Sequence, residues 1–248
     1  MNKFLRLIIL IICCGIFLFS GYKVVTYFYG TFQTHQLNSN LIDSINKEEG
    51  RKLSFSQKYE KLLNRNSDMV AWIKIEDTQL NYPVMLTPDN EEYYLRKNFD
   101  KTYEFRGTLF LNGNANLKER DDNIIIYGHN MDDGTMFGVL RKYYDEDFYL
   151  KHKTIQFESA YENSTYEIAY AFRTVDEFGH KLFIDYYHFY NASSELEFES
   201  QMRLYERASY YHTGVTPKYG DKLITLSTCE YTEDNGRFVI VARRMENK

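Results

Sequence analysis

Eight short runs of β-branched and aromatic residues follow one another along the chain, with polar turns between them. Such runs predict β-strands, because branched and aromatic side chains pack well on a pleated sheet. Only three prolines occur in 248 residues, so little in the chain opposes pairing between these strands. The predicted strands are residues 69–75, 79–85, 106–112, 123–129, 153–159, 164–175, 222–229 and 237–244.

One clear helix interrupts this pattern late in the chain. Ser194 and Glu197 have the spacing of a capping box at its start, and Gly214 can end it. Many short strands with a single late helical insertion predict a mainly β fold, a closed β-barrel, rather than an α/β sheet. The apolar face of the predicted helix carries Phe198, Met202 and Tyr205.

The N-terminus carries a run without charge at residues 7–22, preceded by Lys3 and Arg6. A membrane-spanning helix needs about 20 apolar residues, and flanking basic side chains can reach the membrane surface from a shorter run. We expect a retained signal-anchor, because no A-x-A-like cleavage pattern follows; a cleaved signal peptide is the alternative. Basic residues before the run predict an N-terminus inside the cell and a C-terminal domain outside, a single-pass membrane protein.

Three segments follow from this pattern. Residues 1–29 would form a cytoplasmic tip and membrane anchor, residues 30–67 a helical stalk and lead-in, and residues 68–248 the catalytic barrel. In the lead-in, Ser54 and Gln57 have capping-box spacing and predict a short helix. A net charge of −5 and the lack of a basic run argue against nucleic-acid binding.

Cys229 is the only cysteine beyond residue 14, and it ends a predicted strand. The last two strands read as a hairpin whose loop, residues 230–236, places Cys229 opposite Arg237. We therefore expect a thiol and a guanidinium side by side, with Thr225 and Ser227 facing the same groove. The opposite, core-facing side would carry Ile224, Leu226, Phe238 and Ile240.

A thiol becomes a nucleophile as thiolate, which a nearby cation favours. Acyl transfer also needs a proton donor and a group that stabilises the oxyanion. His129, at the end of an apolar strand, is the candidate donor, and Arg237, which stays protonated, is the candidate stabiliser. The simpler alternatives are a buried structural cysteine, a structural histidine and a surface ion pair of Arg237.

Together these residues carry a family resemblance. The strings "TLSTC" (225–229), "GRFVIVARR" (236–244) and "YGHN" (127–130) look like the signature of sortases, the cysteine transpeptidases of Gram-positive cell surfaces. "DMVAWIKIEDTQLNYPVM" (68–85) resembles the opening strands of the same family, and the resemblance extends to residue 244. The helical insertion before the Cys strand, with N-terminal helices, is similar to class B; class A enzymes, the alternative, have a shorter connection there.

The resemblance implies a closed eight-stranded sortase-type barrel. We expect no cofactor and no metal, because the histidines lack metal-ligand spacing and no acidic loop has a calcium-ligand pattern. The resemblance also implies that Cys229 attacks a sorting peptide to form a thioacyl enzyme, that His129 protonates the departing amine, and that Arg237 stabilises the oxyanion. A peptidoglycan amine would then accept the peptide, which makes the sorting peptide, this amine and the membrane the expected partners. The positions that match substrate contacts of the class B pattern are Tyr127, Ser227 and Glu230.

Two other functions stay open from the sequence. A surface cysteine hydrolase or protease could use the same Cys and His, and a membrane-tethered scaffold could keep the site without activity. The sequence identifies neither the sorting motif nor the amine.

Overall fold

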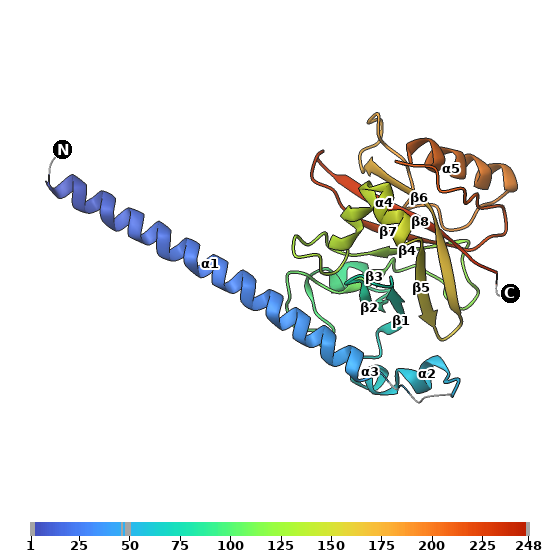
Figure 1. Cartoon of the computed structure of the whole chain (residues 1–248), viewed down its shortest axis with the longest axis horizontal. Coiled ribbons are helices and arrows are strands. Elements are labelled where there is room, and N and C mark those ends of the chain that lie inside the picture. The colour runs from blue at the N-terminus through green and yellow to red at the C-terminus, as the bar shows by residue number, and fades with distance from the viewer. Residues whose placement is uncertain (1–2, 46, 48–50, 247–248) are drawn as a thin grey trace. The chain divides into compact units, whose positions relative to one another are not determined.

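The computed structural model describes residues 3–45, 47 and 51–246 (Figure 1). These residues belong to two compact units, one within residues 1–44 and the other within residues 45–248. The second unit contains all of the predicted strands, so the candidate site is described within it.

The first unit is one helix, α1 (Lys3–Asp43), which contains the charge-free run at residues 7–22. By its length and composition this helix could cross a membrane. It continues without a break through residue 29, where we expected the anchor to give way to the stalk. No proline lies in this stretch to end the helix, so the predicted anchor and the first part of the stalk share one element.

In the second unit, eight of the described segments form a closed β-barrel with the order β1-β2-β3-β4-β7-β8-β6-β5. β2 pairs with β3 and β4 pairs with β7 in parallel, and the other neighbours are antiparallel. The predicted barrel and its strands are confirmed, although β3 is shorter than expected. The bounds are β1 (Met69–Lys74), β2 (Asn81–Met85), β3 (Leu109–Leu111), β4 (Asn123–Tyr127), β5 (Thr154–Ser159), β6 (Asn163–Val175), β7 (Leu223–Cys229) and β8 (Gly236–Arg244).

Short helices lead into the barrel and connect its strands. The predicted capping box is present, since the Ser54 side chain accepts from the Gln57 backbone N–H and the Gln57 side chain accepts from that of Ser54. The short helices are α2 (Phe55–Lys58), α3 (Glu60–Arg65), α4 (Glu146–Lys151) and the 3₁₀ helices η1 (Glu91–Arg96) and η2 (Gly138–Tyr144).

The longer helix α5 (Glu195–Ala208) lies in the connection between β6 and β7. It begins at the predicted cap, Ser194, whose side chain accepts from the Glu197 backbone N–H. The predicted end at Gly214 is wrong, because the helix stops six residues earlier. The Tyr210 N–H donates instead to the carbonyl of Ala171 (2.9 Å), which leads the chain onto β6. The predicted buried face is confirmed as Phe198, Met202 and Tyr205.

Apolar layers lie on both faces of the barrel wall. The predicted core side of the last hairpin is confirmed, because these side chains belong to the cluster that fills the barrel. A second cluster joins α5 and its flanking segments to the outer face of β4, β6, β7 and β8. The β7 strand is therefore covered on both faces. The inner side chains are Ile224, Leu226, Phe238 and Ile240.

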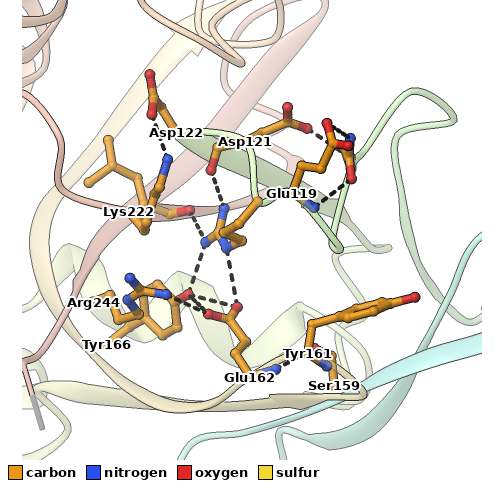
Figure 2. A network of polar contacts seen from close by, with 12 residues as sticks. Glu119, Asp121, Asp122, Ser159, Tyr161, Glu162, Tyr166, Lys222 and Arg244 are labelled. Carbon is orange, nitrogen blue, oxygen red and sulfur yellow. Dashed lines mark hydrogen bonds and ion pairs between the residues drawn. The ribbon is translucent and has the colours of Figure 1, made fainter.

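A polar network holds the end of β7 that lies away from Cys229 (Figure 2). Glu162, only 8% exposed, accepts hydrogen bonds from Tyr166 (2.9 Å) and pairs with both Arg120 (3.3 Å) and Arg244 (3.2 Å). Arg120 also donates to the Leu223 carbonyl (2.8 Å), at the first residue of β7. A cation that is almost fully buried thus ties β7 to the β5–β6 turn.

Changing Glu162→Gln should destabilise the protein strongly. The carboxylate offsets the charge of Arg120, whose side chain is 9% exposed, and removing one partner of a buried pair leaves the other charge uncompensated. We expect the free energy of unfolding to fall by about 3 kcal/mol in urea titrations. Glu199→Gln, which breaks an exposed pair with Arg203, is the control and should change it by less than about 0.5 kcal/mol. Equal effects of the two changes would contradict the role of the network.

Candidate active site

Cys229 is the last residue of β7, and Arg237 lies directly opposite it on β8. The predicted register of this hairpin is confirmed from this end to the pairing of Leu223 with Arg243 at the other. Opposed residues of an antiparallel pair project from the same face, so the register brings a thiol and a guanidinium to one edge of the barrel. Cys229 is half-buried and forms no disulfide.

His129 reaches the same edge through the parallel pairing of β4 with β7. Tyr127, the last residue of β4, pairs with Ser227, two residues before the cysteine. Parallel strands run in the same direction, so His129 follows β4 where Cys229 ends β7. The backbone continues this alignment past the strand, since the Gly128 N–H donates to the Ser227 carbonyl (3.2 Å).

Two side chains lock the ends of β4 and β7 together on either side of His129. Thr228 Oγ1 donates to the Gly128 carbonyl (2.7 Å), and Asn130 Nδ2 donates to the Cys229 carbonyl (2.8 Å). One bond starts from each strand, so neither end can slide along the other without losing a bond. We call this pair of bonds the strand-end clamp.

The His129 imidazole has a defined partner. Its Nε2 lies 2.8 Å from the carbonyl oxygen of Leu95, in η1. The pKa of His129 lies below the ordinary value of 6.5, chiefly because burial disfavours the charged ring and also because Arg96 is nearby. The bond to Leu95 acts in the other direction and raises the pKa. The net effect keeps His129 neutral at neutral pH.

Arg237 is held from two sides. Its Nη1 donates to the Gly236 carbonyl (3.0 Å), and its Nη2 lies 3.7 Å from a carboxylate oxygen of Asp176, just after β6. The Arg237 side chain is still 29% exposed, so it can reach a group in solution. A guanidinium carries five N–H donors and no acceptor, which suits it to bind a carbonyl oxygen or an oxyanion.

The predicted groove is wrong for two of its residues. Thr225 is fully buried and Ser227 is 1% exposed, because the insertion between β6 and β7 covers this face of the strand. Ser227 Oγ shares a hydrogen bond with the hydroxyl of Tyr186 (2.7 Å). Burial raises the pKa of Tyr186 to about 12, so this hydroxyl stays protonated. On this face of β7, only the end of the strand at Cys229 extends beyond the insertion and is partly exposed.

The other two predicted contact residues lie near the edge in different settings. Tyr127 is half-buried against Phe110, with 5.6 Å between ring centroids, and burial raises the pKa of its hydroxyl. The Glu230 carboxylate accepts hydrogen bonds from the backbone N–H (3.1 Å) and hydroxyl (2.6 Å) of Thr232. Glu230 therefore shapes the loop between β7 and β8. That Tyr127, Ser227 and Glu230 contact a substrate stays a prediction.

Several groups of this site were missed from the sequence. They are the Leu95 carbonyl, the clamp donors Thr228 and Asn130, and Asp176 beside Arg237. The clamp donors could have been found, since each lies next to a predicted catalytic residue and carries a side chain able to donate. A backbone carbonyl leaves no such signal.

The comparisons with known proteins agree with this geometry. The family model for the sortase domain matches residues 73–245. The sortase B of Listeria monocytogenes is 33% identical over 97% of this chain and 95% of its own length, and that of Staphylococcus aureus is 31% identical over 98% and 97%. A solved substrate complex of Staphylococcus aureus sortase B superposes with a TM-score of 0.71 at 31% identity, covering 79% of this chain and 88% of that one.

With a closed barrel and a cysteine, a histidine and an arginine at one edge of it, the chain belongs to the sortase family of cysteine transpeptidases. Within that family its similarity is to the class B sortases, as the insertion containing α5 predicted.

Changing Thr228→Val should reduce activity by more than the accompanying loss of stability can explain. The variant keeps the shape of the side chain and removes its bond to Gly128, so the strand-end clamp loses one of two bonds. We expect stability to fall by about 1 kcal/mol and peptide cleavage to fall at least about tenfold. Thr225→Val, which removes a buried bond to Asn123 farther along β7, is the control. It should cost similar stability with near-normal cleavage, and equal cleavage by the two variants would contradict this role for the clamp.

Lowering the pH should destabilise the protein in part through His129. Its pKa is lower in the folded chain, so the unfolded chain binds more protons near pH 6.5. The stability contributed by the neutral ring is present above the unfolded pKa and is lost as the pH falls through the folded one. We expect the free energy of unfolding of the full chain to fall as the pH is lowered through about 6.5 and below, and to fall less in His129→Gln. The same pH dependence in both proteins would contradict this assignment.

Proposed function

We propose that this protein is a membrane-anchored class B sortase that uses Cys229, His129 and Arg237. The observation that carries the proposal is the pairing of Cys229 with Arg237 at the end of β7, with His129 at the neighbouring strand end. A solved structure of Staphylococcus aureus sortase B is a complex with its substrate. This similarity supports peptide binding at the equivalent edge of the barrel in the present protein.

In the proposed reaction the Cys229 sulfur attacks the carbonyl carbon of a sorting peptide. A carbon–sulfur bond forms as the carbon–nitrogen bond breaks, and the proton of the thiol passes through His129 to the departing amine. An incoming amine then attacks the thioester and gives a proton to His129, and the thiol is restored. The incoming amine belongs to peptidoglycan, so the peptide becomes attached to the cell wall.

Arg237 has the oxyanion role in this scheme. Negative charge develops on the carbonyl oxygen during both attacks, and a positioned guanidinium stabilises it without reorganising. Asp176 and the Gly236 carbonyl fix the orientation of Arg237 before the peptide arrives. Arg237 does not serve as the base, because its guanidinium stays protonated.

We extend the proposal to the peptide site and the membrane. Tyr127 and Glu230 would line the peptide site, and Ser227 would support it through its bond to Tyr186. Helix α1 would anchor the chain through residues 7–22, with the basic residues before them inside and the barrel outside.

A peptide-library assay with mass detection tests the function. The full chain should form a thioacyl adduct on Cys229 and, with an added glycine peptide as amine, a ligated product. Cys229→Ala should form no adduct, and Arg237→Lys should cleave about 100-fold more slowly with an unchanged circular dichroism spectrum. Arg243→Lys, on the same face at the other end of β8, is the control and should keep most activity.

The outcomes separate the competing functions. Cleavage without ligation would indicate a cysteine hydrolase, and processing by Cys229→Ala would refute the nucleophile. No adduct with any peptide would favour the inactive scaffold.

A further inference from the structure

The carbonyl of Leu95 is the only partner that the described structure records for the His129 ring nitrogens. A carbonyl oxygen accepts hydrogen bonds and cannot donate one. At 2.8 Å from it, Nε2 must therefore carry the proton. Because the ring is neutral at neutral pH, its other nitrogen, Nδ1, is left with the free lone pair.

Gly107 lies directly behind this carbonyl. A Cβ built on Gly107 would fall 2.5 Å from the carbonyl oxygens of both Tyr94 and Leu95, far inside van der Waals contact. Its φ of +63° is also in the left-handed region, which side chains other than glycine's rarely adopt. Two independent constraints thus require glycine at the position against which the Leu95 carbonyl rests.

The segment around Gly107 is bonded to the end of η1 at several points, so it holds the carbonyl rigidly. The Thr108 N–H donates to the Tyr94 carbonyl (3.0 Å), and Thr108 Oγ1 donates to the Lys97 carbonyl (2.9 Å). The Glu104 N–H donates to the Arg96 carbonyl (3.0 Å).

The same segment is fixed to the loop that follows His129. Arg106 is fully buried and pairs with Asp133 (3.4 Å), four residues after the histidine. The carbonyl and the imidazole it orients are therefore held by one continuous set of contacts.

We propose that Gly107 is a positioning residue: it sets the Leu95 carbonyl, which holds His129 with its proton on Nε2 and leaves Nδ1 to exchange protons in the reaction. A backbone carbonyl thereby does what a carboxylate does for the histidine of many hydrolases. The proposal rests on the proposed role of His129 in catalysis and adds which nitrogen acts and what selects it.

The protonation state can be read in the unaltered protein, with one variant needed only to assign the signals. Nitrogen-15 NMR of the histidine-labelled full chain in detergent, assigned with His129→Gln, distinguishes a protonated from an unprotonated ring nitrogen. We expect Nε2 protonated and Nδ1 unprotonated at neutral pH. A protonated Nδ1 together with an unprotonated Nε2 would overturn the proposal, whatever the activity of the enzyme.

Gly107→Ala tests the origin of this preference. The added methyl group must displace the carbonyl, so the variant should show a mixture of the two ring forms and a lower His129 pKa. We expect kcat about tenfold lower with little change in KM, the effect of one lost hydrogen bond. Gly214→Ala is the matched control: its φ is +80° and its Cβ would meet nothing within 4 Å.

The pH–rate profile supplies a second reading of the same change. The acid limb should move down in pH in Gly107→Ala and stay in place in Gly214→Ala. The substitution leaves in place the charged and titratable groups near His129, among them Arg96 in η1, the Arg106–Asp133 pair, and Cys229 and Arg237 at the same barrel edge.

Should Gly107→Ala fail to fold, Thr108→Val loosens the end of η1 without a backbone clash and should shift the ring forms in the same direction. An unchanged ring form and profile in the folded variant would overturn the role of Gly107. Retained activity in His129→Gln would overturn the proposed role of His129 in catalysis, whereas the ring form of His129 tests Gly107 directly, so the two failures are distinguishable.

Discussion

The register of β7 against its two neighbours is the constraint on which the site depends. One neighbour, β8, brings Arg237 opposite Cys229, and the other, β4, brings His129 to the same edge. A shift of one residue would turn the thiol toward the barrel interior and bring Thr228 or Glu230 opposite Arg237 in its place. Apolar packing on the inner face and the network around Glu162 at the far end both oppose such a shift. The stability of the barrel and the geometry of the candidate site therefore both depend on the same register of β7.

Much of the barrel could be predicted because its signals are local. Ile224 and Leu226 alternate with polar residues, so the sequence shows which side of β7 is apolar. The short loop from Cys229 to Arg237 determines the hairpin register in the same way. The end of α5 was predicted wrongly because Gly214 is a permissive residue, whereas the actual end depends on a bond from Tyr210 to a distant strand. Anchor and stalk were separated at residue 30 because polarity changes there, but helix geometry does not change at that point, and α1 runs through both to Asp43.

The residues of the candidate site could be predicted from the sequence, but their surroundings could not. Cys229 and Arg237 could be paired by counting along a hairpin, but the burial of Ser227 depends on an insertion that packs over it from elsewhere in the chain. The partner of His129 was beyond prediction for a different reason. Every residue has a carbonyl group, so no side-chain pattern singles out that of Leu95. Such a contact follows only from the path of the backbone, which Gly107 makes possible.

The parallel pairing of β4 with β7 also has a consequence for how the enzyme folds. The two bonds of the strand-end clamp join residues 99 and 100 positions apart. Contacts so distant in sequence must overcome the entropy of closing a long loop, and they slow folding relative to local hairpins. Cys229 and His129, the proposed nucleophile and proton donor, therefore come together only when the barrel closes. A chain that has not yet closed its barrel carries Cys229 apart from His129, so in the proposed mechanism it acquires reactivity together with its final fold.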